Sequence, residues 1–160
     1  MTRADILEKH PPRMENVLLI LHDLQNHNPR NYLSKTDLEQ AAGYLNTTRA
    51  TIYGIASYYT LFSLTPRGRH IIRICRSPVC RMGNDGDVFK ALNRLLNIDI
   101  GQTTPDGLFT LETAECLGHC DRAPLMTVDE SIYGDLTPDR IEAVIREYRE
   151  KKKRVRRSQR

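Results

Sequence analysis

The sequence has no tryptophan and no apolar run near 18 residues, and only four of its 160 residues are cysteines. A helix that spans a bilayer needs about 20 apolar residues, so we expect no transmembrane segment. The apolar stretch 17–21 is too short for a secretory signal and is followed by polar residues, which favours a cytoplasmic location. Neither a glycine-rich dinucleotide loop nor a phosphate-binding loop is recognisable, so the sequence predicts no nucleotide site on this chain.

The basic charge of the chain is concentrated at one end. Residues 151–160 hold seven basic side chains and no acidic one, whereas the whole chain carries a net charge of +4. Without this segment, 17 Lys and Arg face 20 Asp and Glu, a net charge of −3. The charge therefore belongs to a basic C-terminal tail, interpreted first as a solvated end, then as a docking strip for an acidic partner subunit, and last as a nucleic-acid or membrane-surface contact. No nucleic-acid partner is expected.

Helical and extended patterns occupy different parts of the chain. Residues 1–13 end in a Pro-Pro sequence and are interpreted as a flexible leader. From 14 to 68, apolar residues recur at three- and four-residue steps after cap residues such as Ser34, which predicts a helical segment. The remainder predicts an α/β domain at 69–150, ahead of the tail at 151–160. Its expected elements are strand 70–75, helix 85–97, strands 108–114 and 124–128, a turn at 133–135, and a final helix from about 137.

The four cysteines form two close pairs. Four residues separate Cys75 from Cys80, three separate Cys116 from Cys120, and 35 residues lie between the pairs. Each pair follows a predicted strand, so both pairs can lie on loops at strand ends and meet. A [2Fe–2S] cluster needs four thiolates, two on each iron, and two separated pairs supply that arrangement.

Other interpretations of the four cysteines remain open from spacing alone. A structural zinc site also takes four thiolates, with spacers of two to four residues. Disulfides are uncommon in a reducing cytoplasm, and nothing selects among the three possible pairings. A thioredoxin-type redox pair needs a two-residue spacer, which neither pair has. Spacing and the expected location favour the iron–sulfur cluster, and the alternative function is a zinc-stabilised adaptor without redox activity.

Two longer stretches carry a family resemblance. They are IYGIASYYTLFSLTPRGRHIIRIC, which ends at Cys75, and ECLGHCDRAPLMTVDESIYGDLTPDRI, which begins at Glu115. On these stretches, residues 16–146 resemble the 24-kDa (NuoE-type) subunit family of respiratory complex I. That family includes the small subunits of NAD(P)-linked, often electron-bifurcating, hydrogenases and of NAD-dependent formate dehydrogenases.

The resemblance implies a fold and a site. It implies an α/β protein in which an N-terminal helical segment packs on a thioredoxin-like domain that holds one [2Fe–2S] cluster. The implied ligands are Cys75, Cys80, Cys116 and Cys120, and no residue is implied to be catalytic. Thioredoxin-like folds often carry a cis proline near the active loop, which predicts a cis Ala123–Pro124 bond.

The resemblance also implies partners. The chain would be a subunit of an NAD(P)H-linked oxidoreductase, next to a larger flavin-bearing subunit that oxidises NADH. Its cluster would exchange single electrons with that flavin. FMN and NAD(P) would belong to the partner, and further iron–sulfur or catalytic subunits would complete the complex.

The first pair departs from the family pattern. Many relatives have Gly-Thr between these cysteines, whereas this chain has Arg76-Ser77-Pro78-Val79. Pro78 has no N–H to donate to a cluster and Arg76 adds a cation, so both residues bear on a reduction potential. His119 invites a Rieske-type ligand interpretation, but the four cysteine positions already supply a full ligand set.

Overall fold

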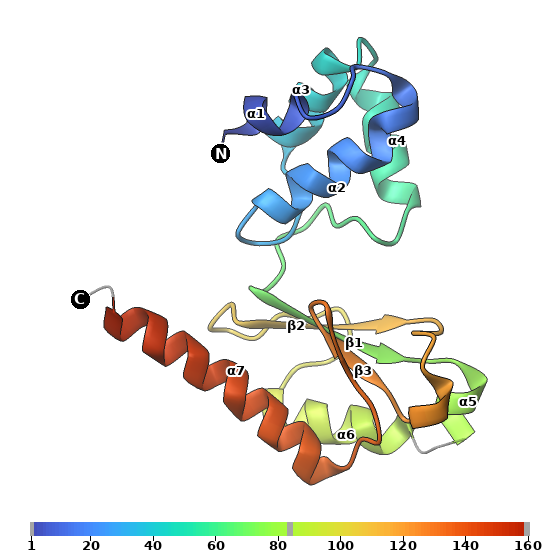
Figure 1. Cartoon of the computed structure of the whole chain (residues 1–160), viewed down its shortest axis with the longest axis vertical. Helices are drawn as coiled ribbons and strands as arrows, with labels where there is room; N and C mark the ends of the chain where they lie inside the picture. Colours follow the sequence, from blue (N-terminus) through green and yellow to red (C-terminus); the bar gives the residue numbers. More distant parts are fainter. Residues whose placement is uncertain (1, 83–84, 159–160) are drawn as a thin grey trace. The chain divides into compact units, whose positions relative to one another are not determined.

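The chain folds as two compact units, Met1–Arg67 and Gly68–Arg160, called here the helical unit and the sheet unit (Figure 1). The structure is a computed structural model that describes residues 2–82 and 85–158. No helix among these residues is long and apolar enough to cross a membrane.

The helical unit is built from short helices around its own apolar core. Its elements are α1 (Arg3–Leu7), the 3₁₀ helix η1 (Met14–Asn16), α2 (Val17–His27), α3 (Lys35–Tyr44) and α4 (Arg49–Tyr58). Ser34 and Thr48 begin α3 and α4, because each side chain accepts a hydrogen bond from a backbone N–H of the first turn. The largest fully buried side chains of the unit are Ile6, Ile20, Leu21, Leu24, Leu33 and Ile52.

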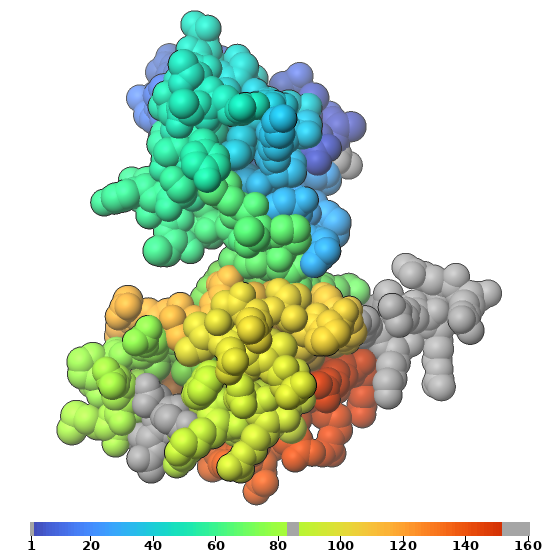
Figure 2. Space-filling view, turned by 180° about the vertical axis from the view of Figure 1, so that it is seen from behind, coloured from blue at the N-terminus to red at the C-terminus, as the bar shows by residue number. Residues whose placement is uncertain are grey.

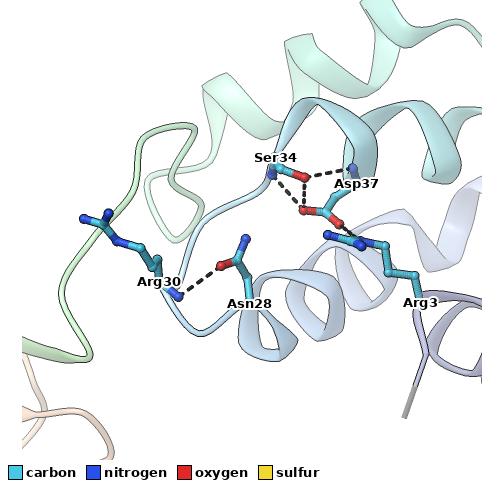
Figure 3. Close-up of polar contacts among 5 residues, drawn as sticks. All are labelled: Arg3, Asn28, Arg30, Ser34 and Asp37. Carbon is cyan, nitrogen blue, oxygen red and sulfur yellow. Dashed lines mark hydrogen bonds and ion pairs between the residues drawn. The ribbon is translucent and has the colours of Figure 1, made fainter. Parts of the chain in front are cut away.

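The expectation of a flexible leader over residues 1–13 is wrong at α1. Ile6 has no exposed surface and belongs to the core of the helical unit. Arg3 forms an ion pair with Asp37, whose other carboxylate oxygen accepts hydrogen bonds from the N–H and the hydroxyl of Ser34 (Figure 3). Because Asp37 is almost completely buried, α1 supplies the charge that this carboxylate needs.

The sheet unit holds four strands in the order β2-β1-β3-β4. Strands β1 (His70–Cys75) and β2 (Phe109–Ala114) run parallel. Strand β3 (Met126–Val128) is antiparallel to β1, and β4 (Ser131–Tyr133) is antiparallel to β3. The parallel register places Cys75 opposite Ala114, so β1 and β2 end side by side. Strand β4 was not predicted, since only a turn was expected in this region.

Helices α6 (Asp85–Leu96) and α7 (Pro138–Ser158) pack on one face of the sheet (Figure 1). Inward residues of the strands and helices form one core, which includes Ile72, Ile74, Val88, Leu92, Phe109, Leu111, Met126, Ile141 and Ile145. On the other face, Arg73 and Glu112 sit opposite each other on β1 and β2 and form an ion pair of 3.2 Å. These layers confirm the expected α/β class. Helix α7 continues into the basic segment as far as Ser158, and residues 159–160 lie outside the described part.

The N-terminal end of β1 is tied to the β3–β4 turn and to α7. His70 Nδ1 lies 2.7 Å from Asp129 Oδ2, and the N–H of Ile71 donates to the same carboxylate at 2.9 Å. The His70 ring also stands edge-on to Tyr148 of α7, with ring centroids 4.8 Å apart. Burial, together with a hydrogen bond to Tyr148, raises the pKa of Tyr133 to about 12, so this phenol stays neutral.

Candidate metal centre

The first cysteine loop, residues 75–80, begins at the last residue of β1. The short helix α5 (Pro78–Met82) follows at once and carries Cys80. This helix was not predicted from the sequence. Both Cys75 and Cys80 are fully buried, and they pack together with Leu125 in one apolar cluster. The side chains of Cys75 and Cys80 are therefore shielded from water.

The second cysteine loop, residues 115–122, follows the end of β2. Cys116 and Cys120 have Sγ atoms 3.5 Å apart, and Cys116 is exposed. Between them, Gly118 has a φ of +84°, a left-handed conformation that favours glycine. Its N–H donates to Cys116 Sγ, with the nitrogen and sulfur 3.4 Å apart. The loop ends in the 3₁₀ helix η2 (Cys120–Arg122).

The two loops meet at one edge of the sheet unit. Their ribbons and surfaces lie at the same edge in both views, the first loop in yellow-green and the second in orange (Figures 1 and 2). Leu117 of the second loop packs against the buried cluster of Cys75 and Cys80. Cys75 Sγ also lies 3.1 Å from the carbonyl oxygen of Glu115, to which a neutral thiol donates. The parallel pairing of β1 and β2 thus places the two loops that carry the four cysteines next to each other.

The surroundings lower the pKa of the Cys75 thiol and raise the pKa of the Cys80 and Cys120 thiols. Burial raises the pKa of Cys75, but hydrogen bonds with Ser77 and with the N–H of Leu117 outweigh it, so the net pKa is lowered. Burial and the neighbouring Cys75 raise the pKa of Cys80. Hydrogen bonding with Cys116 raises the pKa of Cys120, and the charges of Cys80 and Cys75 contribute to that rise. The two pairs therefore interact electrostatically.

The donor set is compatible with an iron–sulfur core. All four cysteines are free thiols, arranged as two pairs on adjoining loops. Within residues 2–82 and 85–158, no three or more His, Cys, Asp or Glu side chains are grouped as the ligands of one metal ion. A [2Fe–2S] core takes two thiolates on each iron, which is the arrangement that two pairs offer.

Several residues that shape the site were not predicted. Ser77 and Leu117 supply hydrogen bonds to Cys75, and Leu125 covers both cysteines of the first pair. The position of Ser77 between the two cysteines of the first loop could have indicated its role. Leu117 and Leu125 are distant from Cys75 in the sequence, so no local pattern indicates their contacts with it. The Ala123–Pro124 bond beside the second loop is cis, which confirms that expectation. Arg76 and His119, expected beside the site, are both exposed.

Comparisons with known proteins agree with this geometry. The family model described as thioredoxin-like [2Fe-2S] ferredoxin matches residues 3–149. The HndA subunit of the NADP-reducing hydrogenase from Solidesulfovibrio fructosivorans is 32% identical over 145 residues, which cover 91% of this chain and 84% of that protein. The E subunit of the NADH-quinone oxidoreductase from Rickettsia bellii is 33% identical over 142 residues, with 88% and 85% covered.

A solved structure shows the same fold. The crystal structure of an NAD⁺-reducing [NiFe]-hydrogenase in the air-oxidized state aligns with 85% of this chain at a TM-score of 0.75 and 23% identity. This chain spans 23% of the length of the hydrogenase chain that it matches. The alignment supports a shared architecture across both units of this chain.

Proposed function

The chain belongs to the thioredoxin-like [2Fe-2S] ferredoxin family, and from this premise we propose that it is an electron-transfer subunit carrying one [2Fe–2S] cluster. The resemblance found in the sequence is confirmed by the family match and by relatives that are named as subunits of redox enzymes. The observation that carries the proposal is the meeting of two free cysteine pairs at the ends of the parallel strands β1 and β2.

We assign the cluster ligands to Cys75, Cys80, Cys116 and Cys120. When bound, a [2Fe–2S] cluster accepts and returns one electron at a time. The chain's own groups hold and shield it: the first pair lies in an apolar cluster, and the N–H groups of Leu117 and Gly118 point to thiol sulfurs. Such N–H donors stabilise negative charge on sulfur in a partly buried site.

We further propose that the host is a cytoplasmic, multisubunit NAD(P)H-linked oxidoreductase of the hydrogenase, complex I or formate dehydrogenase type. In this proposal, a partner subunit holds FMN and the NAD(P) site and exchanges single electrons with the cluster. The names of the relatives support it, because they are subunits of an NADP-reducing hydrogenase and of an NADH-quinone oxidoreductase.

The cluster is tested on the full chain purified without oxygen. We expect two irons and two acid-labile sulfides per chain, visible charge-transfer absorption, and a rhombic EPR signal after one-electron reduction. A colourless protein with one zinc per chain and no redox signal would instead support the zinc-stabilised adaptor.

The ligand assignment is tested by single substitutions. Cys80→Ser and Cys116→Ser, one from each pair, should each lose most of the cluster or change its EPR spectrum. His119→Ala, which removes a neighbouring side chain from the second loop, should retain both iron and spectrum. A Cys116→Ser protein with an unaltered spectrum contradicts the assignment.

The partner is tested by adding NADH to the chain alone and to the native complex. The cluster should be reduced by NADH only in the complex, since this chain is expected to hold neither flavin nor nucleotide. Reduction of the isolated chain by NADH would contradict this division of roles, as would a native complex without a flavin subunit.

A further inference from the structure

The turn that follows β4 comes unusually close to the cysteine site at Gly134. A Cβ atom placed on Gly134 would lie 2.7 Å from Arg122 Cβ, 2.9 Å from the Arg122 carbonyl oxygen and 3.0 Å from Leu125 Cδ2. The backbone of Gly134 is not left-handed, so the lack of a side chain serves the close approach itself. The sequence placed this glycine within the stretch SIYGDLTP, but no role followed from the pattern.

One of these contacts leads to the second cysteine pair. Arg122 is the last residue of η2, which begins at Cys120. The next residue of the turn, Asp135, donates its N–H to the Arg122 carbonyl at 2.7 Å, and its carboxylate pairs with Arg122 Nε at 3.1 Å. Asp135 has a φ of +52°, a conformation that Asp and Asn tolerate better than most residues. The turn is thereby bonded to the end of the second loop.

The other contact leads to the first pair. Leu125 is 1% exposed and packs against Cys75 and Cys80. Its carbonyl oxygen accepts a hydrogen bond of 3.2 Å from the N–H of Cys75. A shift of Leu125 would therefore reach both cysteines of the first loop. Gly134 is therefore next to one residue on the side of each cysteine pair. Arg122 follows the second pair, and Leu125 packs against the first pair.

We propose that the Gly134–Asp135 turn sets the spacing between the two cysteine pairs, with Gly134 as a positioning residue for the cluster. This inference rests on the proposed function, in which the four cysteines hold one [2Fe–2S] cluster. Outer residues of this kind orient ligands without touching the metal. Gly134 leaves room for Arg122 and Leu125 to approach, and any side chain there displaces one or both of these residues.

Gly134→Ala tests the proposal, and the chain offers a matched control. A Cβ on Gly68 would lie 2.7 Å from the Phe109 carbonyl carbon and 2.9 Å from Thr110 N, a clash at similar distances in the same unit. That clash falls where β1 and β2 begin, at the opposite end from the cysteines. Gly68→Ala therefore reports the cost of a steric clash at the end of these strands that is far from the cysteines.

We expect both variants to unfold at a lower temperature than the wild type. Only Gly134→Ala should shift the EPR g values and the reduction potential, and it should lose iron to a chelator about 10-fold faster, on the scale of the affinity losses that outer-residue changes cause. For a Gly134→Ala chain that does not fold, Asp135→Ala provides the second variant. It should move the same signals, and Asp135→Asn should restore them, because Asn keeps the left-handed backbone and an acceptor oxygen.

The outcomes separate this proposal from the function on which it rests. A wild-type chain without a [2Fe–2S] signal overturns both. A wild-type chain with the cluster, combined with a Gly134→Ala chain whose EPR spectrum and potential match those of Gly68→Ala, overturns the positioning role alone.

Discussion

Cys75 is surrounded by groups from both cysteine loops. Ser77 belongs to its own loop, whereas the N–H of Leu117 comes from the other, and together they lower the pKa of Cys75 against the effect of burial. Iron binds the thiolate form of cysteine, so these hydrogen bonds favour the form that ligation needs. The pKa of Cys75 therefore depends on contacts with both loops.

Asp129 is a second residue whose environment has a measurable consequence. Burial raises its pKa, but hydrogen bonds from His70 and the Ile71 N–H outweigh it, so its pKa falls below the ordinary 3.8. A carboxyl with a lowered folded-state pKa stabilises the fold above its unfolded pKa, and that stability is lost as pH falls through the folded value. About two fifths of the side chain is exposed, so screening limits the effect to roughly 1 kcal/mol or less.

We therefore predict that Asp129→Asn lowers the free energy of unfolding at pH 6.5 and that the difference from wild type shrinks below pH 4. The substitution keeps a residue that tolerates the φ of +54° and an oxygen for the Ile71 N–H. Urea unfolding of the cluster-free chain at both pH values measures the effect. Glu130→Gln, at an exposed neighbouring position, should show no such difference, and a gap for Asp129→Asn that is equal at both pH values contradicts the prediction.

At the scale of elements, α1 is part of the helical core. Ile6 is fully buried in the helical unit, so we predict that Ile6→Ala costs about 2–5 kcal/mol of unfolding free energy. Thermal or urea unfolding measures this change, and Lys9→Ala on the exposed surface provides the control. If Ile6→Ala costs no more than a surface substitution, about 0.5 kcal/mol, α1 is not anchored.

Local patterns predicted most of the elements but not the contacts between distant residues. The β-branched run before Cys75 predicted β1, and Ser34 predicted the start of α3. Helix α1 was missed because its stability comes from Ile6 burial and from Asp37, 34 residues away from Arg3. No local rule reveals such a partner, and α1 is too short to form alone.

For the candidate site too, local patterns were predicted and contacts between distant residues were not. The spacing of the cysteines and their places after strands were sufficient to predict that two loops meet. The three-residue strand β4 and the five-residue helix α5 are too short for a periodic pattern, so neither was visible. Gly134 lies in a stretch that carries the family resemblance, yet its contacts with Arg122 and Leu125 depend on how β4 returns to the second loop.

At the scale of the whole molecule, each unit has a separate apolar core. The sheet unit contains all four cysteines, the strands β1 to β4, and the helices that pack on this sheet. We predict that residues 68–160 expressed alone fold and carry the cluster, because the contacts described around the cysteines lie within this unit. Iron analysis and EPR of the fragment measure this.

Residues 1–67, which contain no cysteine, provide the control for that fragment experiment and should bind no cluster. A soluble, folded 68–160 fragment that takes up no iron, while the full chain does, would show that the helical unit is needed for cluster binding. The spectrum of the fragment should also match that of the full chain.

The unequal burial of the two cysteine pairs has a consequence for the protein before it receives iron. Cys75 and Cys80 are enclosed, whereas Cys116 is open to solvent with its sulfur 3.5 Å from that of Cys120. A dissolved oxidant therefore reaches the outer pair first, and its most direct product is a disulfide between those two sulfurs. Such a bond would leave Cys75 and Cys80 as the only free thiols, so the proposed cluster requires Cys116 and Cys120 to stay reduced until iron and sulfide bind.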